Sequence, residues 1–419
     1  MSRISGPNLR NKYDFRSDVL DIIIGGQSTI DSTTAFQVLN LEEADLFIKS
    51  YGYDLENPIE KAEVLGNFHE ALNFIRKNFL QSENPDGLKL EIPRKILEMT
   101  DVRELFLMIG PNNNITLQPN DYPKFNMQNW ACSILKVMHT IAHIDKDLRS
   151  SYFADIQKQI FDRFYRSIHR DIEGKLFLGD KADDPFRVDL VAFETKPKKS
   201  RDSIILKLLH KSENVAEDIF DRVGIRFVTH SPLGALQVIK YLKDKMIVMA
   251  PNIKPSRSRN TLVYIEGFRT QLDQLLNAVE NEESDDTTLA QNFVRDVELI
   301  TQPNSTNQGN PHSSEHYRAI QFTCRQLIKL RNPLYDDLKE LKSLVKAKPV
   351  DDDVLKTIDR IDLKYTQREI RFFYPFEVQV VDIKSADENE KGKSAHSEYK
   401  RSQIFTAMKR VMGVLADDV

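Results

Sequence analysis

Three segments of this 419-residue chain carry residue types and spacings that suit phosphate and metal chemistry. In the first, four cations lie within residues 196–201, directly before a predicted helix over residues 202–209. Ser203 and Lys207 are four residues apart, so they share one face of that helix. Cations such as Lys199 at the positive end of a helix suit a polyphosphate ligand better than they suit each other. A solvated linker between domains is the alternative interpretation.

The second segment contains a carboxylate at the start of a strand. Asp221 directly precedes a predicted buried strand that includes Gly224 and Arg226. A carboxylate in this position is a natural ligand for hydrated Mg²⁺, which keeps several waters and takes one or two protein carboxylates. An aspartate that only caps the turn into the strand is the alternative interpretation.

The third segment is an apolar strand with two polar residues on one face. Glu377 and Gln379 share that face, because side chains alternate along a strand with a period of two. Polar side chains that point the same way from a buried strand need partners. Glu377 is therefore either a metal ligand or general base, or a structural carboxylate paired with Arg226 or Arg371 across the sheet.

Two further segments become informative through their order along the chain. A basic loop contains Lys254, Arg257 and Arg259, and a predicted C-terminal helix begins with His396 and Lys400. The chain thus presents a basic helix start, an aspartate before a strand, a basic loop, an aromatic strand, a strand glutamate and a His/Lys helix, in that order.

The elements that must position these residues fall into two parts. Residues 1–185 are predicted to be mostly helical, because apolar residues recur at three- and four-residue spacing over 60–80, 126–143 and 152–172. From about residue 187, short β-branched runs alternate with helices, at 223–229, 245–249, 261–265, 317–323 and 371–381. The sequence therefore predicts an α/β (α+β) fold, in which a mixed β-sheet of about five strands flanked by helices follows a helical N-terminal domain.

The predicted domain boundary lies between residues 185 and 186, and the role of the N-terminal domain is left open. Insertions at about 267–314 and 329–369 interrupt the second domain, residues 186–419. Polar, turn-rich composition predicts exposed loops at 282–288, 301–314 and 387–393, and residues 333–365 are predicted to form a charged helical insertion between two strands.

Composition indicates a soluble globular protein. Hydrophobic residues make up 40% and charged residues 29% of the chain, which excludes collagen-like and wholly disordered classes. The net charge of −4 means that any polyanion site must be local. Two cysteines 192 positions apart, Cys132 and Cys324, argue against a disulfide framework. No apolar run approaches the ~18 residues of a membrane span, so the sequence predicts no membrane partner and a cytoplasmic location.

With these residues in this order, the segment from about Glu194 to Arg410 resembles the synthetase domain of the RelA/SpoT family. The matched pieces share their internal spacing with that family: Lys199-(x3)-Ser203-(x3)-Lys207, Asp221-x-x-Gly-x-Arg226, Tyr317-Arg-Ala-Ile320, Glu377-x-Gln379 and His396-x-x-Tyr399-Lys400. The resemblance implies a nucleotidyltransferase-like fold and a Mg²⁺-dependent enzyme. Such enzymes transfer pyrophosphate from ATP to the ribose 3′-hydroxyl of GDP or GTP, which makes (p)ppGpp.

The resemblance also implies roles for individual residues. On the donor side, Lys199, Ser203, Lys207 and Arg226 would bind ATP, and Asp221 would bind Mg²⁺. Phosphoryl-type transfer depends mainly on positioning and on neutralising developing charge with Mg²⁺ and cations, so these residue types fit the reaction.

On the acceptor side, Glu377 would be the metal partner or the base that takes the proton from the attacking hydroxyl. Tyr317 would stack on the acceptor base, with Gln379, His396 and Lys400 nearby. Aromatic stacking gives affinity without much base selectivity.

Four differences from the family pattern concern the acceptor and adenine pockets. His316 stands where the family usually has Gly, Gln321 where it has His, and Pro197 where it has a basic residue. Val381 and Asp382 replace a common Arg-Thr pair. The same fold resembles toxic synthetases that pyrophosphorylate the 3′ end of tRNA, so tRNA is an alternative acceptor. A degenerate nucleotide-binding regulator is the third alternative, and the oligomeric state is left open.

One more cluster has metal-ligand spacing. His139, His143 and Asp145 lie on adjacent turns of one predicted helix. Bifunctional RelA/SpoT members hydrolyse the alarmone with a metal-dependent His-Asp domain, but the sequence contains no His-Asp dipeptide. Core or surface histidines are therefore expected here.

Overall fold

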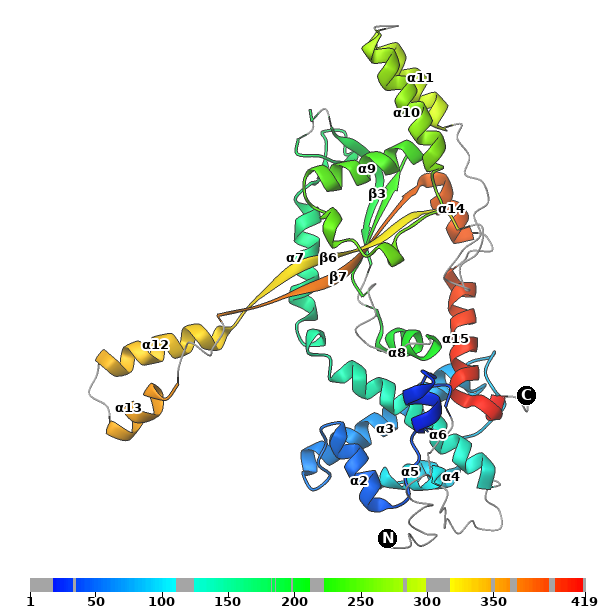
Figure 1. The fold of residues 1–419 in the computed structure, drawn as a ribbon, viewed down its shortest axis with the longest axis vertical. Helices are drawn as coiled ribbons and strands as arrows, with labels where there is room; N and C mark the ends of the chain where they lie inside the picture. The colour runs from blue at the N-terminus through cyan, green and yellow to red at the C-terminus, as the bar shows by residue number, and fades with distance from the viewer. Residues whose placement is uncertain are drawn as a thin grey trace, which may run out of the picture.

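The computed structural model of the protein describes residues 18–32, 35–110, 124–181, 183–184, 186–196, 199–211, 222–281, 285–298, 317–347, 351–361, 368–391 and 396–416. These residues form two lobes, one helical and one built on a mixed β-sheet. Helix α6 crosses the helical lobe, and helix α7 runs along one side of the sheet lobe (Figure 1). The predicted α/β class is confirmed.

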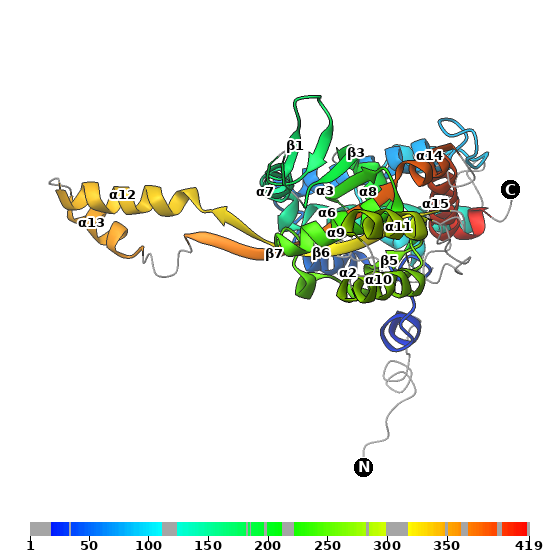
Figure 2. The ribbon, with the colours of Figure 1, turned by 90° about the horizontal axis from the view of Figure 1, so that it is seen from above.

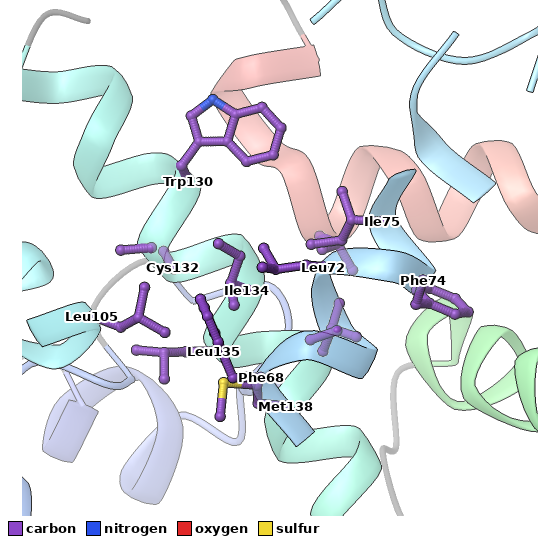
Figure 3. Packing of buried hydrophobic residues seen from close by; sticks show 14 of the residues in the cluster. Phe68, Leu72, Phe74, Ile75, Leu105, Trp130, Cys132, Ile134, Leu135 and Met138 are labelled. Carbon is purple, nitrogen blue, oxygen red and sulfur yellow. The ribbon is translucent and has the colours of Figure 1, made fainter. Parts of the chain in front are cut away.

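The helical lobe has one hydrophobic core. Its helices are α2 (Leu41–Ser50), α3 (Pro58–Phe79), α4 (Arg94–Leu97), α5 (Arg103–Ile109), α6 (Lys124–Asp145), α8 (Arg201–His210) and α15 (His396–Met412), with a π-helix (Asp18–Ile24) and a 3₁₀ turn (Gly413–Ala416). Figure 3 shows Phe68 of α3 against Leu135 and Met138 of α6. Two of its helices, α8 and α15, come from beyond residue 185, the predicted end of the N-terminal domain.

Local sequence signals explain where several of these helices begin. Asn57 accepts a hydrogen bond from the Ile59 amide at the start of α3, with Pro58 in the first turn. Ser200 caps α8 by accepting from the Ser203 amide. The predicted helices over 60–80, 126–143 and 202–209 are confirmed by α3, α6 and α8.

The second lobe contains a seven-stranded sheet in the described part of the chain, where about five strands were expected. The spatial order is β1-β2-β3-β4-β7-β6-β5. The strands are β1 (Ile168–Arg170), β2 (Leu176–Leu178), β3 (Val188–Thr195), β4 (Gly224–Thr229), β5 (Arg259–Asn260), β6 (Ile320–Arg331) and β7 (Glu369–Asp382). The central pair β4 and β7 is parallel, and the other neighbours are antiparallel.

Helices cover one face of this sheet. Helix α7 (Phe153–Tyr165) and helix α9 (Pro232–Asp244) bury apolar side chains against it, including Phe164 of α7, Phe227 of β4 and Phe376 of β7. Ser231 caps α9 by accepting from the Gly234 amide, and Pro232 stands at the first position of the helix. The other face carries the polar residues described below, with α14 (Ile383–Lys391) beside it.

Two helical hairpins project from the sheet lobe. The first is formed by α10 (Ile265–Glu280) and α11 (Asp286–Glu298), and the second by α12 (Pro333–Ala347) and α13 (Asp352–Asp359). Strands β6 and β7 extend beyond the sheet and carry the second hairpin far from the body of the molecule (Figures 1 and 2). The predicted helical insertion between the two strands is confirmed.

Several local predictions were wrong. Residues 245–249 form turns rather than a strand, since Met246 has a φ of 55° and Ile247 and Val248 fill the core without pairing. Residues 261–264 are not a strand either, because the Asn260 side chain accepts from the Leu262 and Val263 amides and turns the chain.

The predicted helix over 152–172 ends at Tyr165, where α7 ends, and Ile168–Arg170 form β1 instead; β3 was not predicted. Two polar segments were also misassigned. Residues 387–391, expected in a loop, belong to α14, and Asn389 of that helix bonds both the amide and the carbonyl of Arg318. Residues 286–288, also expected in a loop, begin α11. The predicted loop over 301–314 lies outside the described residues.

The two cores divide the chain differently from the predicted boundary at residues 185 and 186. Strands β1 and β2 and helix α7 precede residue 185 but belong to the sheet lobe. Helices α8 and α15 follow it but belong to the helical lobe, as Ile205 and Met408 show by their burial there. Among the described residues, no helix is long and apolar enough to cross a membrane.

Candidate functional site

A row of polar side chains crosses five strands on the open face of the sheet. Pairing places Glu194 of β3 beside Arg226 of β4, Arg226 beside Gln379 of β7, Gln379 beside Gln321 of β6, and Gln321 beside Arg259 of β5. Directly paired residues point to the same side of a sheet, so these five residues share one face. The common face of Glu377 and Gln379, expected from the sequence, places Glu377 in the next row.

The second row centres on Glu377. Register pairs Glu377 with Gly224 of β4 on one side and with Thr323 of β6 on the other. The amide of Lys196, just after β3, donates to the carbonyl oxygen of Gly224 at 2.9 Å. The Lys196 side chain crosses β4 and places its Nζ 2.7 Å from Oε1 of Glu377.

Gly224 leaves the space that Lys196 occupies. A Cβ atom built on Gly224 would stand 2.5 Å from Cδ and 3.1 Å from Cγ of the Lys196 side chain. Real Cβ atoms do not approach carbon that closely, so any larger residue at this position would displace the lysine. The glycine therefore leaves the room that Lys196 needs to reach Glu377.

Glu377 is buried and has both carboxylate oxygens engaged. The residue is 8% exposed, and Gln321 donates from Nε2 to Oε2 at 2.6 Å. A buried carboxylate requires a cation and hydrogen-bond donors, and Lys196 and Gln321 supply them. The partners anticipated from the sequence, Arg226 and Arg371, form their ion pairs elsewhere.

Tyr317 lies next to this carboxylate. Its hydroxyl accepts a hydrogen bond from Nε2 of Gln379, and its backbone oxygen accepts from the Thr261 hydroxyl at 2.8 Å. Burial raises the pKa of the Tyr317 phenol; the charge of Glu377 raises it further, and the charge of Lys196 opposes the shift. The phenol therefore stays neutral and belongs to the same electrostatic environment as Glu377.

Arg226 supplies a second cation on this face. Its Nη1 lies 3.3 Å from Glu194 and 3.1 Å from Glu390 of α14. Its Nε is buried and has no hydrogen-bond partner among the described residues. An unsatisfied buried guanidinium donor is costly, so an acceptor supplied by a ligand would stabilise this side chain.

The predicted phosphate-binding helix α8 lies between the sheet and the rest of the helical lobe (Figure 1). Lys199, Ser203 and Lys207 are half-buried, and the Ser203 and Ser200 hydroxyls lie 2.8 Å apart. At the first position of α8, Arg201 forms ion pairs with Glu70 of α3 and with an acid at the end of α6, which raise the pKa of its guanidinium. The helix start is therefore fixed to the helical lobe.

Several predicted site residues cannot be placed around Glu377. Asp221, Pro197 and His316 lie outside the described residues. The helix α15 begins at His396, whose side chain also lies outside the described part, and Lys400 is exposed on the same helix. Of the predicted site residues, the structure brings together Glu377, Gln379, Tyr317 and Arg226.

Sequence reasoning missed three charged residues that complete this group. They are Lys196, which pairs with Glu377, and Glu194 and Glu390, which pair with Arg226. The signal for Lys196 was present in the sequence as Gly224, because a glycine within an apolar strand often marks the close approach of another group. No comparable signal marks Glu390, which comes from a helix that was expected to be a loop.

The oxygen chemistry of Glu377 suits Mg²⁺, which binds carboxylates and waters. In the described part of the chain, no three His, Cys, Asp or Glu residues are close enough together to hold a metal ion. Glu377 is therefore the one predicted metal ligand that the described structure places, and its carboxylate is held in a fixed position by Lys196 and Gln321.

The histidine cluster of α6 is part of the helical core. Nδ1 of His139 lies 2.6 Å from the Tyr51 hydroxyl, and burial lowers the pKa of His139 to about 3. His143 stacks edge-on against His139, and Asp145 forms an ion pair with Arg201. These partners support the structural interpretation of the cluster.

Comparisons with models of protein families, with curated proteins and with solved structures found no match to this chain.

Proposed function

We propose that the protein is an enzyme that transfers pyrophosphate from ATP to the ribose 3′-hydroxyl of GDP or GTP with the help of Mg²⁺. The observation that carries this proposal is Glu377. Its carboxylate is buried on the open face of a central strand, between Lys196 and Gln321 and beside the neutral phenol of Tyr317. The two buried free cysteines, Cys132 and Cys324, are compatible with a cytoplasmic location.

In the proposed reaction, the 3′-oxygen of the acceptor attacks the β-phosphorus of ATP. The bond between that phosphorus and the oxygen bridging to the α-phosphate breaks, and AMP leaves. The hydroxyl proton passes to Glu377. Mg²⁺, when bound, would neutralise the charge on the transferred phosphates, with Asp221 and Glu377 as its ligands.

The cations have separate tasks in this scheme. Lys196 holds the Glu377 side chain in place before substrates bind. Arg226, with its buried unsatisfied Nε, would donate to a phosphate oxygen of ATP. Lys199, Ser203 and Lys207 would bind ATP from α8, which requires donor phosphates to lie between α8 and the sheet.

The acceptor would bind on the Tyr317 side of Glu377. Gln379 fixes the phenol by donating to its hydroxyl, so the ring is positioned before the acceptor arrives. A preorganised ring gives stacking affinity with little loss of side-chain entropy. His396 and Lys400 would contact the acceptor from α15.

A tRNA 3′ end is the second candidate acceptor, favoured by the position of the basic loop. Arg259 pairs directly with Gln321, and the Lys254 amide donates to the Thr323 carbonyl at 2.9 Å. The basic loop therefore lies beside β6, and β6 is the strand next to β7, which carries Glu377. Cations there would contact phosphates of a longer acceptor.

The deciding experiment incubates the purified protein with Mg²⁺ and γ-labelled ATP, with GDP, GTP and deacylated tRNA offered in parallel. Label on GDP or GTP is the expected result. Label on tRNA alone would replace the first acceptor by the second. No label on any acceptor, together with intact ATP binding, would contradict the proposed enzyme and favour a regulatory nucleotide-binding protein.

Two isosteric variants test the mechanism. Glu377→Gln and Asp221→Asn are each expected to lower the transfer rate by at least about 10²-fold, the lower range for loss of a general base. Neither change removes much volume, so the circular dichroism spectrum should be preserved. Unaltered turnover in the Glu377→Gln variant would contradict the role given to this carboxylate.

A further inference from the structure

Strands β6 and β7 leave the sheet as a two-stranded ribbon. Residues 325–331 of β6 pair with residues 369–375 of β7, whereas β4 pairs only with residues 377–382 and β5 only with residues 320–321. Figure 2 shows the ribbon extending from the body toward α12 and α13. An isolated two-stranded ribbon is at best marginally stable in water, so this ribbon needs further contacts on its faces to be stable.

Helix α7 packs against one face of the ribbon. Gln326, Ile328 and Leu330 of β6 are buried, and Gln159 of α7 bonds both the amide and the carbonyl of Lys329. This face continues the apolar core of the sheet lobe.

The opposite face is exposed and cationic. Along β6 the alternate residues Arg325, Leu327, Lys329 and Arg331 are all exposed. Opposite them on β7, Phe373 pairs with Leu327, Arg371 with Lys329, and Glu369 with Arg331. The face thus carries four cations and one acid around an apolar pair. No carboxylate of the described residues forms an ion pair with Arg325 or Lys329, whereas Arg331 pairs with Asp336 and Arg371 with Glu369.

The centre of this face is a large apolar pair. Phe373 is 51% exposed and Leu327 is 41% exposed. An exposed phenyl ring between cations offers a stacking surface for a planar group, and the cations offer contacts for negative charges on either side. This combination differs from an ordinary solvated strand, where single charges alternate with small polar residues.

The cationic face is continuous with the candidate active site. Two residues inward from Arg325 along β6 lies Thr323, which pairs with Glu377, and two further residues inward lies Gln321, which pairs with Gln379. Side chains of one face recur every second residue at about 6.8 Å. A strand-like ligand lying on Arg325 and Lys329 would therefore point along the same face toward Glu377.

We propose that the exposed face of the ribbon, defined by Arg325, Leu327, Lys329, Arg371 and Phe373, binds single-stranded RNA. Its cations contact the phosphates, and Phe373 stacks on an unpaired base. Charge complementarity selects this partner, because the face has cations in a line with an aromatic ring between them. The further statement that the RNA end lies at Glu377 rests on the proposed function with its second candidate acceptor, an RNA 3′ end.

The test measures fluorescence anisotropy of a labelled single-stranded RNA oligonucleotide with the full-length protein over a range of salt concentrations. The double variant Arg325→Glu/Lys329→Glu is expected to weaken binding. The slope of log K against log[salt] should become smaller by about 1.4, because each of the two lost single-strand contacts contributes about 0.7. The matched control Lys175→Glu/Lys240→Glu makes the same charge change in the β1–β2 turn and on α9, and should bind as the unaltered protein does.

Phe373→Ala separates stacking from charge. It is expected to weaken binding roughly 5- to 150-fold without changing the salt slope, because stacking is worth about 1–3 kcal/mol per base and releases no counterions. A duplex of the same sequence should bind more weakly than the single strand.

Three results would overturn the proposal: no binding of RNA by the unaltered protein, equal losses in the ribbon and control double variants, or a self-associated protein that Phe373→Ala dissociates. The last result would assign the face to a second copy of the chain. Transfer to free GDP or GTP should be unchanged in the ribbon variants, while Glu377→Gln should retain RNA binding. Failure of the ribbon proposal is thus distinguishable from failure of the proposed enzyme.

Discussion

The two faces of the central sheet differ in character, although adjacent residues of the same strands form them. Phe376 and Glu377 are neighbours on β7, yet Phe376 packs edge-on against Phe164 of α7 while Glu377 faces away from that core and pairs with Lys196. On the first face, apolar side chains and two helices exclude water. On the second face, buried polar groups satisfy one another.

This difference indicates that one face of the sheet stabilises the fold while the other carries the candidate functional residues. Burying a carboxylate requires a partner, and an apolar residue at position 377 would avoid that requirement. The open face nevertheless carries Glu377, Gln379 and Arg226 in the centre of the sheet. Their presence is unnecessary for packing, which supports a functional reason for them.

The largest expected effect contrasts the two neighbours directly. Phe376 is 1% exposed, so Phe376→Ala should lower the free energy of unfolding by about 3–5 kcal/mol. Glu377→Gln should lower it by no more than about 1 kcal/mol, since Lys196 is partly exposed and the glutamine keeps the volume. Urea unfolding of both variants measures the difference. Similar losses in the two variants would mean that Glu377 is a structural residue.

A smaller effect is expected from Gly224→Ala, which acts on the open face alone. The new methyl group would displace the Lys196 side chain from Glu377, because the built Cβ lies 2.5 Å from Cδ of the lysine. We expect a loss of transfer activity of at least about 10-fold with an unfolding cost of about 1–2 kcal/mol. Gly66→Ala is the control, because nothing lies within 4 Å of its Cβ in α3 and alanine favours a helix. Full activity in Gly224→Ala would show that the contact of Lys196 with Glu377 is not needed for transfer.

The hydrogen bond between Gln379 and Tyr317 should contribute less. A double-mutant cycle of Tyr317→Phe and Gln379→Leu is expected to give a coupling free energy of about 0.5–1.5 kcal/mol in unfolding. Tyr317→Phe should keep the acceptor KM within a few fold, since phenylalanine still stacks, whereas Tyr317→Ala should raise it. An equal KM for all three proteins would exclude the ring from the acceptor pocket.

The smallest effect is a change in stability at high pH. The pKa of Tyr317 is raised in the folded protein, so the folded state retains a proton that the unfolded state loses near pH 10. Stability from this group is complete below that pH and decreases as pH rises toward the folded pKa. Unfolding of Tyr317→Phe should therefore depend less on pH in the alkaline range than unfolding of the unaltered protein. Parallel pH dependence would show that the phenol is not perturbed.

Sequence patterns predicted the elements with strong local signals. Spaced apolar residues located α3 and α6. Strands β1, β2 and β3 were all missed. Three residues are too few for an alternating pattern in β1 and β2, and β1 lies within the stretch 152–172 that was predicted to be helical. The run at 245–249 was misassigned because its buried Ile247 and Val248 fill the core without pairing, and an apolar run does not distinguish those states.

The candidate site was predictable in part for similar reasons. Period-two alternation placed Glu377 and Gln379 on one face, which the strand register confirms. The partner of Glu377 depends on which of the neighbouring cations passes over Gly224, and that is decided by tertiary geometry. Glu390 reaches Arg226 from a charged segment that forms a helix, in which Asn389 also bonds to Arg318.

The path of the chain has a consequence for synthesis of the protein on the ribosome. The hydroxyl of Ser133 in α6 donates to the Val411 carbonyl at 3.0 Å, across 278 residues of sequence, and Met408 and Leu415 fill the core of the helical lobe. The core of the helical lobe therefore cannot be completed before α15 has been synthesised. Until then the apolar side chains that α15 covers are exposed, so a nascent chain stalled before α15 would be a preferred client for chaperones and proteases.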